Sequence, residues 1–128
     1  MGIAVTQGIQ ISARTHFEAA HSDPHAARFI FSYRITIANR SEETVQLLRR
    51  HWTIHDSLAA LREVEGPGVV GETPVLKPGE EFTYSSACDL RSGFGRMEGT
   101  YLMRRVRDGA EFHVEIPEMQ LVHPGAAN

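Results

Sequence analysis

The chain has 128 residues, of which 41% are hydrophobic and 23% are charged, and its formal net charge is −3. This length and composition are typical of one globular domain and exclude a disordered chain. The mild negative charge provides no overall field for nucleic acid, so we expect no nucleic-acid partner. No apolar run is long enough to cross a bilayer, and we expect no membrane partner. The one cysteine, Cys88, excludes an internal disulfide, and the lack of an N-terminal apolar segment favours a cytoplasmic location.

A side-chain period of two dominates the sequence and predicts β-strands. Residues 9–17 alternate apolar and polar side chains, as a half-buried strand does. In residues 29–38 one face is apolar from Phe29 to Ile37. The other face carries Ile30, Ser32, Arg34, Thr36 and Ala38, and we expect a central strand. In residues 45–55, Leu48, Trp52 and Ile54 are expected to share the core-facing side. Shorter alternating segments follow at 82–86, 97–103 and 112–116.

Two turn regions complete the predicted architecture. Asp108-Gly109 lies between the last two alternating segments and predicts a hairpin, because glycine accepts the positive φ of a tight turn. Residues 57–63 contain good helix formers behind Asp56 or Ser57 as N-cap, so one or two helical turns are an alternative there. The surrounding strands favour a hairpin.

Together these segments predict an all-β chain. We expect a single antiparallel two-sheet β-sandwich of about seven strands, like a fibronectin type III or immunoglobulin domain. One domain would cover residues 1–128, with its core at about 9–121 and frayed ends.

Five ordered blocks give the sequence a family resemblance. They are residues 46–54 (QLLRRHWTI), 66–74 (GPGVVGETP), 76–82 (LKPGEEF), 95–101 (GRMEGTY) and 112–117 (FHVEIP). In these blocks the chain resembles the bacterial ApaG family, also called CorD, over about residues 9–121. It departs from the family pattern at residues 91–95 and at Glu118-Met119.

The resemblance implies a fibronectin type III-like sandwich and no established activity. The bacterial family is associated genetically with cobalt resistance and magnesium efflux. Its domain also recurs in eukaryotic F-box and polymerase-interacting proteins, where it resembles a binding module. The glycine motif of the family has been proposed as a pyrophosphate site.

Gly66, Gly68 and Gly71 carry that motif here as G-x-G-x-x-G. Such a motif binds phosphate when a helix follows it, because the helix N-terminus supplies free N–H groups and a favourable dipole. Pro74 and Pro78 follow instead, and prolines at these positions do not open a stable helix. We therefore favour a loop that needs glycine for its backbone conformation, and keep an anion nest for pyrophosphate or a nucleotide as the alternative.

No assembled catalytic set is visible, so we predict a non-enzymatic protein-binding module without a cofactor. The predicted site is the Gly66–Gly71 loop with its neighbours in the sequence. Those neighbours are Arg49, Arg50, His51 and Glu72. The expected partner is another protein, and exposed edge strands could also pair two copies of the chain.

A weaker alternative is a divalent-metal sensor. His21, Asp23 and His25 occupy every second position, so in an extended segment they would share one face. Two imidazoles and a carboxylate can hold a transition metal. A polar surface loop is the favoured interpretation of the same residues.

Overall fold

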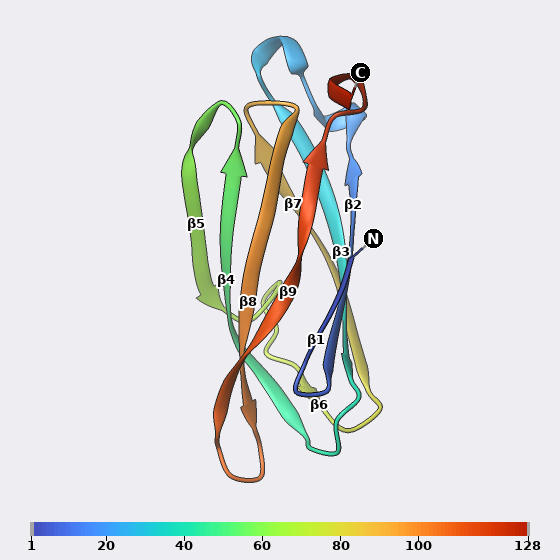
Figure 1. The fold of residues 1–128 in the computed structure, drawn as a ribbon, viewed down its shortest axis with the longest axis vertical. Coiled ribbons are helices and arrows are strands. Elements are labelled where there is room, and N and C mark those ends of the chain that lie inside the picture. Colours follow the sequence, from blue (N-terminus) through green and yellow to red (C-terminus); the bar gives the residue numbers. More distant parts are fainter. Residues whose placement is uncertain (1, 128) are drawn as a thin grey trace.

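The computed structural model describes residues 2–127, which fold into two antiparallel sheets facing each other (Figure 1). The first sheet has the order β1 (Gly2–Thr6), β2 (Ile9–Phe17), β3 (Phe29–Asn39), β7 (Glu81–Leu90). The second has the order β5 (Ala59–Pro67), β4 (Val45–Asp56), β8 (Phe94–Arg105), β9 (Glu111–Val122), and β6 (Val75–Leu76) also pairs with β4. Short 3₁₀ turns lie at Ala19–His21, Pro24–Ala26 and Pro124–Ala127.

The predicted all-β two-sheet sandwich is confirmed, with nine strands in the described residues rather than about seven. The additional strands are β1 and the two-residue β6. Residues 2–6, expected to lie outside the core, form β1 on the edge of β2. Gln7 and Gly8 connect them with φ values of 48° and 80°, which suits a two-residue hairpin turn. Met1 and Asn128, within the ends expected to fray, lie outside the described residues.

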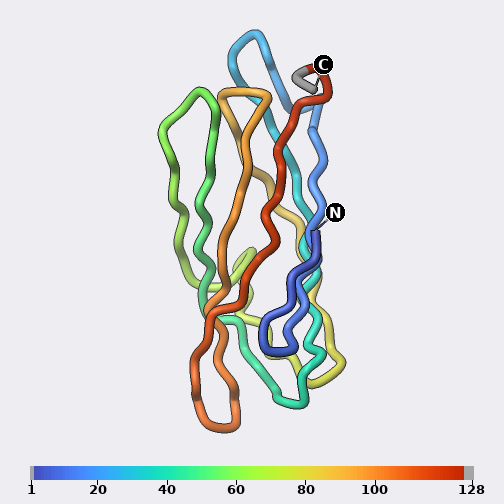
Figure 2. Tube along the Cα trace, in the orientation of Figure 1, coloured from blue at the N-terminus to red at the C-terminus, as the bar shows by residue number. Residues whose placement is uncertain are grey.

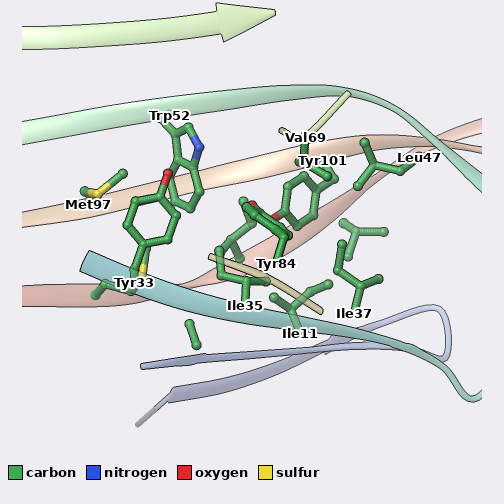
Figure 3. Close-up of a cluster of buried hydrophobic side chains, with 14 of the residues drawn as sticks. Ile11, Tyr33, Ile35, Ile37, Leu47, Trp52, Val69, Tyr84, Met97 and Tyr101 are labelled. Atoms are coloured by element: carbon green, nitrogen blue, oxygen red, sulfur yellow. The ribbon is translucent and has the colours of Figure 1, made fainter. Parts of the chain in front are cut away.

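The core lies between the two sheets, where alternate side chains of both point inward (Figure 3). Ile11, Ile35 and Ile37 of the first sheet face Leu47 and Tyr101 of the second, and all five are nearly or completely buried. β3 is an inner strand of its sheet, between β2 and β7, as predicted.

Trp52 lies in this core, as predicted, with only 2% of its surface exposed. Its ring meets Tyr33 edge to face, with the ring centroids 5.6 Å apart. The contact joins β4 of one sheet to β3 of the other. Edge-to-face geometry of this kind favours a fixed orientation of the two aromatic rings.

The expected facing of β4 is wrong for its first half. Leu47 pairs with Met103 but Arg49 pairs with Leu102, so Leu48 is an extra residue that forms a β-bulge. The bulge shifts the alternation, so Leu47 rather than Leu48 lies in the core. After the bulge the alternation is regular, so Arg50, two residues before Trp52, lies on the same side of the strand as Trp52.

The two predicted hairpins are present. Residues 57–63 continue from β4 through a Ser57–Leu58 turn into β5, so the strand context prevails over local helix propensity. At the opposite end of the molecule, residues 106–110 join β8 to β9, and Gly109 has φ 74° (Figure 2).

The last strand runs further than the sequence pattern predicts. β9 continues past Ile116 through Pro117 to Val122, because a register shift against β8 between Met97 and Gly99 accommodates the proline. β9 is also the last strand of its sheet, so the missing N–H of Pro117 breaks no ladder bond to a further strand.

Candidate functional site

The Gly66–Gly71 run ends a strand and turns without entering a helix. Gly66 closes β5 together with Pro67, and the chain continues through an irregular segment to β6. Gly68 and Gly71 have φ values of 61° and 81°. A Cβ on Gly68 would lie 2.3 Å from the carbonyl oxygen of Glu72, so this position accepts only glycine. The favoured interpretation, a loop with special backbone demands, agrees with this geometry.

The backbone of the loop uses its own hydrogen-bond donors. The N–H of Gly68 donates to the Leu48 carbonyl over 2.9 Å. The N–H groups of Val69 and Glu72 each donate to the carbonyl of the other residue over 2.8 Å. An anion nest needs successive N–H groups that converge on a ligand. Three of the candidate donors are already bonded within the protein, and the Val69 side chain between them is fully buried.

Arg50 stabilises the same loop through its carbonyl groups. Its Nη1 donates to the carbonyl oxygens of Pro67 and Gly68, each over 2.9 Å. A Cβ on Gly66 would lie 3.3 Å from both Nη1 and Nη2, so the guanidinium lies directly against that glycine. Bonds from a charged donor are stronger than neutral ones. Arg50 therefore holds the end of β5 in place.

The other predicted site residues do not gather around the loop. Because side chains alternate along β4, Arg49 and His51 lie on the outer face of the second sheet, opposite to Arg50. There Arg49 pairs with Glu65 at 3.4 Å, and His51 lies 3.8 Å from Glu63. Glu72 is exposed at the loop, and its backbone completes the Val69 bridge. The predicted cluster is thus divided between two faces of the sheet.

The other end of β5 is held by Asp56. Its Oδ2 accepts from the N–H of Arg91 over 2.7 Å, and its Oδ1 accepts from the hydroxyl of Ser92 over 2.7 Å. The N–H of Leu58 also donates to Oδ1, over 3.1 Å, as in an Asx turn. Ser57 donates to the Ser92 hydroxyl over 2.7 Å. This network joins the β4–β5 turn to the β7–β8 turn.

The hydrogen bonds change the acidity of Asp56. Burial acts to raise the pKa of this carboxyl group, but the bonds from Arg91, Ser92 and Leu58 and the charge of Arg62 outweigh it. The pKa of Asp56 is therefore lowered below its usual value. Ser92 is almost fully buried in this contact.

Between these two anchored ends, β5 is open. Its residues from Ala59 to Glu65 are all exposed, and among the strands of residues 2–127 it pairs only with β4. Figure 1 shows β5 at the outer border of its sheet, with no strand beyond it. Its unpaired edge therefore offers backbone donors and acceptors to another strand.

A groove separates β5 from β7, the edge strand of the first sheet. One cavity of about 250 Å³ lies in it. Its lining comprises Tyr33, Arg50, Trp52, Ile54, Arg62, Val64, Ser86, Ala87, Cys88, Asp89 and Met97. Arg62 spans the groove, because its Nη2 donates to the Asp89 carbonyl over 2.6 Å and its Nη1 lies 3.3 Å from the Asp89 carboxylate. Figure 3 shows Tyr33, Trp52 and Met97, which line this cavity, close together in the core.

The cysteine thiol beside this groove and the tyrosine hydroxyls in and near it are protonated at neutral pH. Burial raises the pKa of the Cys88 thiol to about 11, so a thiolate nucleophile is scarce. Burial also raises the pKa values of Tyr33, Tyr84 and Tyr101. The hydroxyls of Tyr84 and Tyr101 are hydrogen-bonded to each other in the core.

The candidate metal residues do not assemble a site. The segment is not extended, because His21 ends one 3₁₀ turn, Asp23 is the N-cap of the next and His25 lies within it. The backbone of Asp23 pairs with that of Arg28 in an isolated antiparallel β-bridge. Within residues 2–127, no group of three or more His, Cys, Asp or Glu side chains is placed to hold a metal ion.

Sequence patterns alone missed Asp56 and Arg62 as members of this region. Asp56 carried one usable signal, an acidic residue at the start of a turn, but that signal was equally compatible with a helix N-cap. Arg62 contacts a residue 27 positions away and carried no local signal.

The fold and the site define a small β-sandwich domain with one open edge strand beside a groove. The profile of the ApaG domain family matches residues 19–105. Protein ApaG of Brucella canis is 46% identical over 121 residues, which cover 94% of this chain and 92% of the relative. Protein ApaG of Brucella anthropi is 47% identical with the same coverage.

A solved structure from Bordetella pertussis, described as an ApaA protein, is similar with a TM-score of 0.86 and 37% identity. The match covers 91% of this chain and 94% of that one. The chain therefore belongs to the ApaG domain family, as the sequence blocks indicate. In the described part of the chain, no helix has the length and apolar character needed to cross a membrane.

Proposed function

We propose that this ApaG-domain protein is a non-enzymatic binding module that takes up an extended segment of another protein along β5. The observation that carries the proposal is the open edge of β5, which is anchored at both ends and exposed along its middle. Strand addition of this kind gives affinity through main-chain hydrogen bonds and specificity through side-chain pockets.

Several exposed apolar side chains lie on the β4–β5 hairpin or next to it. Leu58 in the turn is 75% exposed, Leu61 on β5 is 57% exposed, and Val70 in the glycine loop is 56% exposed. Val64 faces the groove and is partly exposed. Phe94, also exposed, accepts a backbone hydrogen bond from Ser57 beside the turn. Such a set of exposed apolar groups is typical of an interaction surface.

The groove supports specificity in the same proposal. A strand added to β5 would direct alternate side chains toward the cavity of about 250 Å³, whose floor includes Trp52 and Met97. Arg62 and Asp89 at its rim offer charged groups of both signs. A binding role also suits Cys88, whose protonated thiol is a poor nucleophile.

The experiment compares two exposed apolar positions. Leu61→Lys places a charge on β5, whereas Val106→Lys places the same charge on the β8–β9 turn, where Val106 is 50% exposed. We expect a partner captured from lysate by the unaltered protein to be retained by Val106→Lys and lost by Leu61→Lys. Hydrogen exchange on the complex should then show new protection in β5.

Equal recovery by both variants, or protection elsewhere, would contradict the proposal. A second copy of the chain is one possible occupant of the edge. Sedimentation of the purified protein distinguishes this case, because a self-pairing edge makes the mass depend on concentration.

A further inference from the structure

The register of β5 on β4 determines which backbone groups of β5 point to its free edge. The N–H of Gly68 donates to the Leu48 carbonyl, which continues that register by one further pair. In an antiparallel ladder bonded pairs alternate with non-bonded pairs, so residues 62, 64 and 66 direct their N–H and C=O groups to β4. Glu63 and Glu65 therefore direct theirs to the free edge. Pro67, which has no N–H, lies at the next outward position, where none is needed.

The side chains of the same two glutamates lie on the outer face of β5, because they alternate with Val64, which lines the groove. Those of Glu63 and Glu65 are 62% and 61% exposed. Each has one basic neighbour on β4. Glu65 lies 3.4 Å from Arg49, and Glu63 lies 3.8 Å from His51. A carboxylate accepts several hydrogen bonds, so both can also bind donors that approach from beyond the edge.

The ladder geometry determines which side chains of an added strand meet these carboxylates. A strand that bonds to the outward backbone groups of Glu63 and Glu65 places two of its residues directly opposite them. Opposite residues share a face and have Cβ atoms about 5 Å apart, where opposite charges stabilise the pair and like charges destabilise it. The residue between the two lies opposite Val64 and faces the cavity, whose lining includes Trp52 and Met97.

A second copy of β5 does not meet this requirement. Antiparallel pairing of two copies about Val64 would place Glu63 opposite Glu65. Pairing about Glu63 or Glu65 would place that glutamate opposite its own copy, and pairing about Arg62 would place two arginines together. Each arrangement sets like charges directly opposite each other. Charged residues on an edge strand commonly prevent self-pairing in this way.

We infer that the segment taken up by β5 carries two basic residues separated by one apolar residue, with the basic side chains against Glu63 and Glu65. The inference rests on the proposed strand addition and specifies the chemistry of the partner. Arginine suits these positions well, because its guanidinium group can donate two parallel hydrogen bonds to a carboxylate. The apolar residue between them enters the cavity of about 250 Å³ beside Val64.

The test is an NMR titration of the full chain, labelled with ¹⁵N, with two capped nine-residue peptides. The basic peptide has the sequence STVRVRVTS, and its acidic counterpart has glutamate in place of both arginines. We expect the basic peptide to cause saturable shifts at the amides of residues 59–66. It should bind about tenfold more tightly than the acidic peptide, because two positions change from attraction to repulsion. The difference should decrease as sodium chloride is added, because salt screens exposed charges.

Three variants test the role of the glutamates. Glu63→Gln/Glu65→Gln should bind both peptides equally, and Glu63→Lys/Glu65→Lys should prefer the acidic peptide. Glu115→Lys, at an exposed position on β9, should keep the preference for the basic peptide. Because the side chains of Glu63 and Glu65 are exposed, the double glutamine variant should melt close to the temperature of the unaltered protein.

The outcomes separate this inference from the proposed function. Equal binding of both peptides at residues 59–66 of the unaltered chain, or a preference that persists in Glu63→Gln/Glu65→Gln, would overturn the inference and leave strand addition intact. Saturable shifts confined to other strands would contradict both. The absence of saturable binding by the basic peptide would overturn the inference, whereas the capture experiment with Leu61→Lys decides the proposed function separately.

Discussion

The two ends of β5 differ from its middle. At one end, Arg50 bonds the carbonyls of the glycine loop, and at the other, Asp56 joins two turns. Between them, residues 59–65 are exposed and, among the strands that the structure describes, pair only with β4. The glycine loop and Arg50, which most resemble a ligand site, instead fix the end of β5. Residues 59–65, which carry no motif, form the part of the strand that is exposed for binding.

This difference predicts that changes at the ends of β5 affect stability, whereas changes in its middle affect binding. A rigid frame around an exposed strand also limits the entropy lost when a partner strand adds to it.

The largest effect is expected at Gly68. Gly68→Ala places a Cβ against the Glu72 carbonyl and imposes a positive φ on alanine, which should lower the free energy of unfolding by about 3 kcal/mol. Gly71→Ala is the matched control, because its φ is also positive but nothing lies within 4 Å. It should cost about 1–2 kcal/mol. Urea denaturation measures both, and equal losses would show that the close contact at Gly68 has no energetic role.

The next effect is expected at Arg50. Arg50→Gln removes the guanidinium that donates to two carbonyls of the loop, and should lower the free energy of unfolding by about 2 kcal/mol. Arg104→Gln removes an exposed arginine whose bond is to Gln46, and should change it by no more than about 0.5 kcal/mol. A similar effect of both substitutions would mean that Arg50 does not anchor the end of β5.

A smaller, pH-dependent effect is expected at Asp56. Its pKa in the folded protein is lowered from 3.8, so its contribution to stability is present above about pH 4 and is lost as the pH falls through the folded value. Asp56→Asn should therefore melt at a lower temperature than the unaltered protein at pH 7. The difference between the two melting temperatures should become smaller below about pH 4. A constant difference from pH 7 to pH 3 would contradict the role of the charge.

The smallest effect on stability is expected in the middle of the strand. Leu61→Lys should change the free energy of unfolding by no more than about 0.5 kcal/mol, because the side chain is exposed. Thermal melting of the free protein measures this change. A large loss of stability would show that the middle of β5 supports the fold as its ends do, which would contradict the difference between them.

Much of the fold could be predicted from local patterns. The alternation around Ile35 and Ile37 identifies a central strand, and Asp108-Gly109 identifies the last hairpin. These features depend on near neighbours in the sequence. β1 has only five residues and little contrast between its faces, so periodicity could not separate it from a frayed end.

The candidate site was less predictable, because its contacts join distant residues. Ser92 meets Asp56 across 36 positions, and no local pattern indicates that pairing. The glycine loop was recognised from its prolines as a structural turn, and alternation from Trp52 places Arg50 on the inner side of β4. Its bonds to the loop carbonyls, 17 and 18 positions away, have no local signal.

The bulge at Leu48 changes what the deletion of one residue from β4 would do. Removing one residue from a strand normally turns every later side chain to the opposite face. Leu47 and Arg49 pair with consecutive residues of β8, Met103 and Leu102. Deleting Leu48 would therefore restore regular pairing with β8 and leave Trp52 and Ile54 facing the core. What the deletion would remove is the Leu48 carbonyl that accepts from Gly68. The core therefore does not need the extra residue, whereas the glycine loop uses its carbonyl.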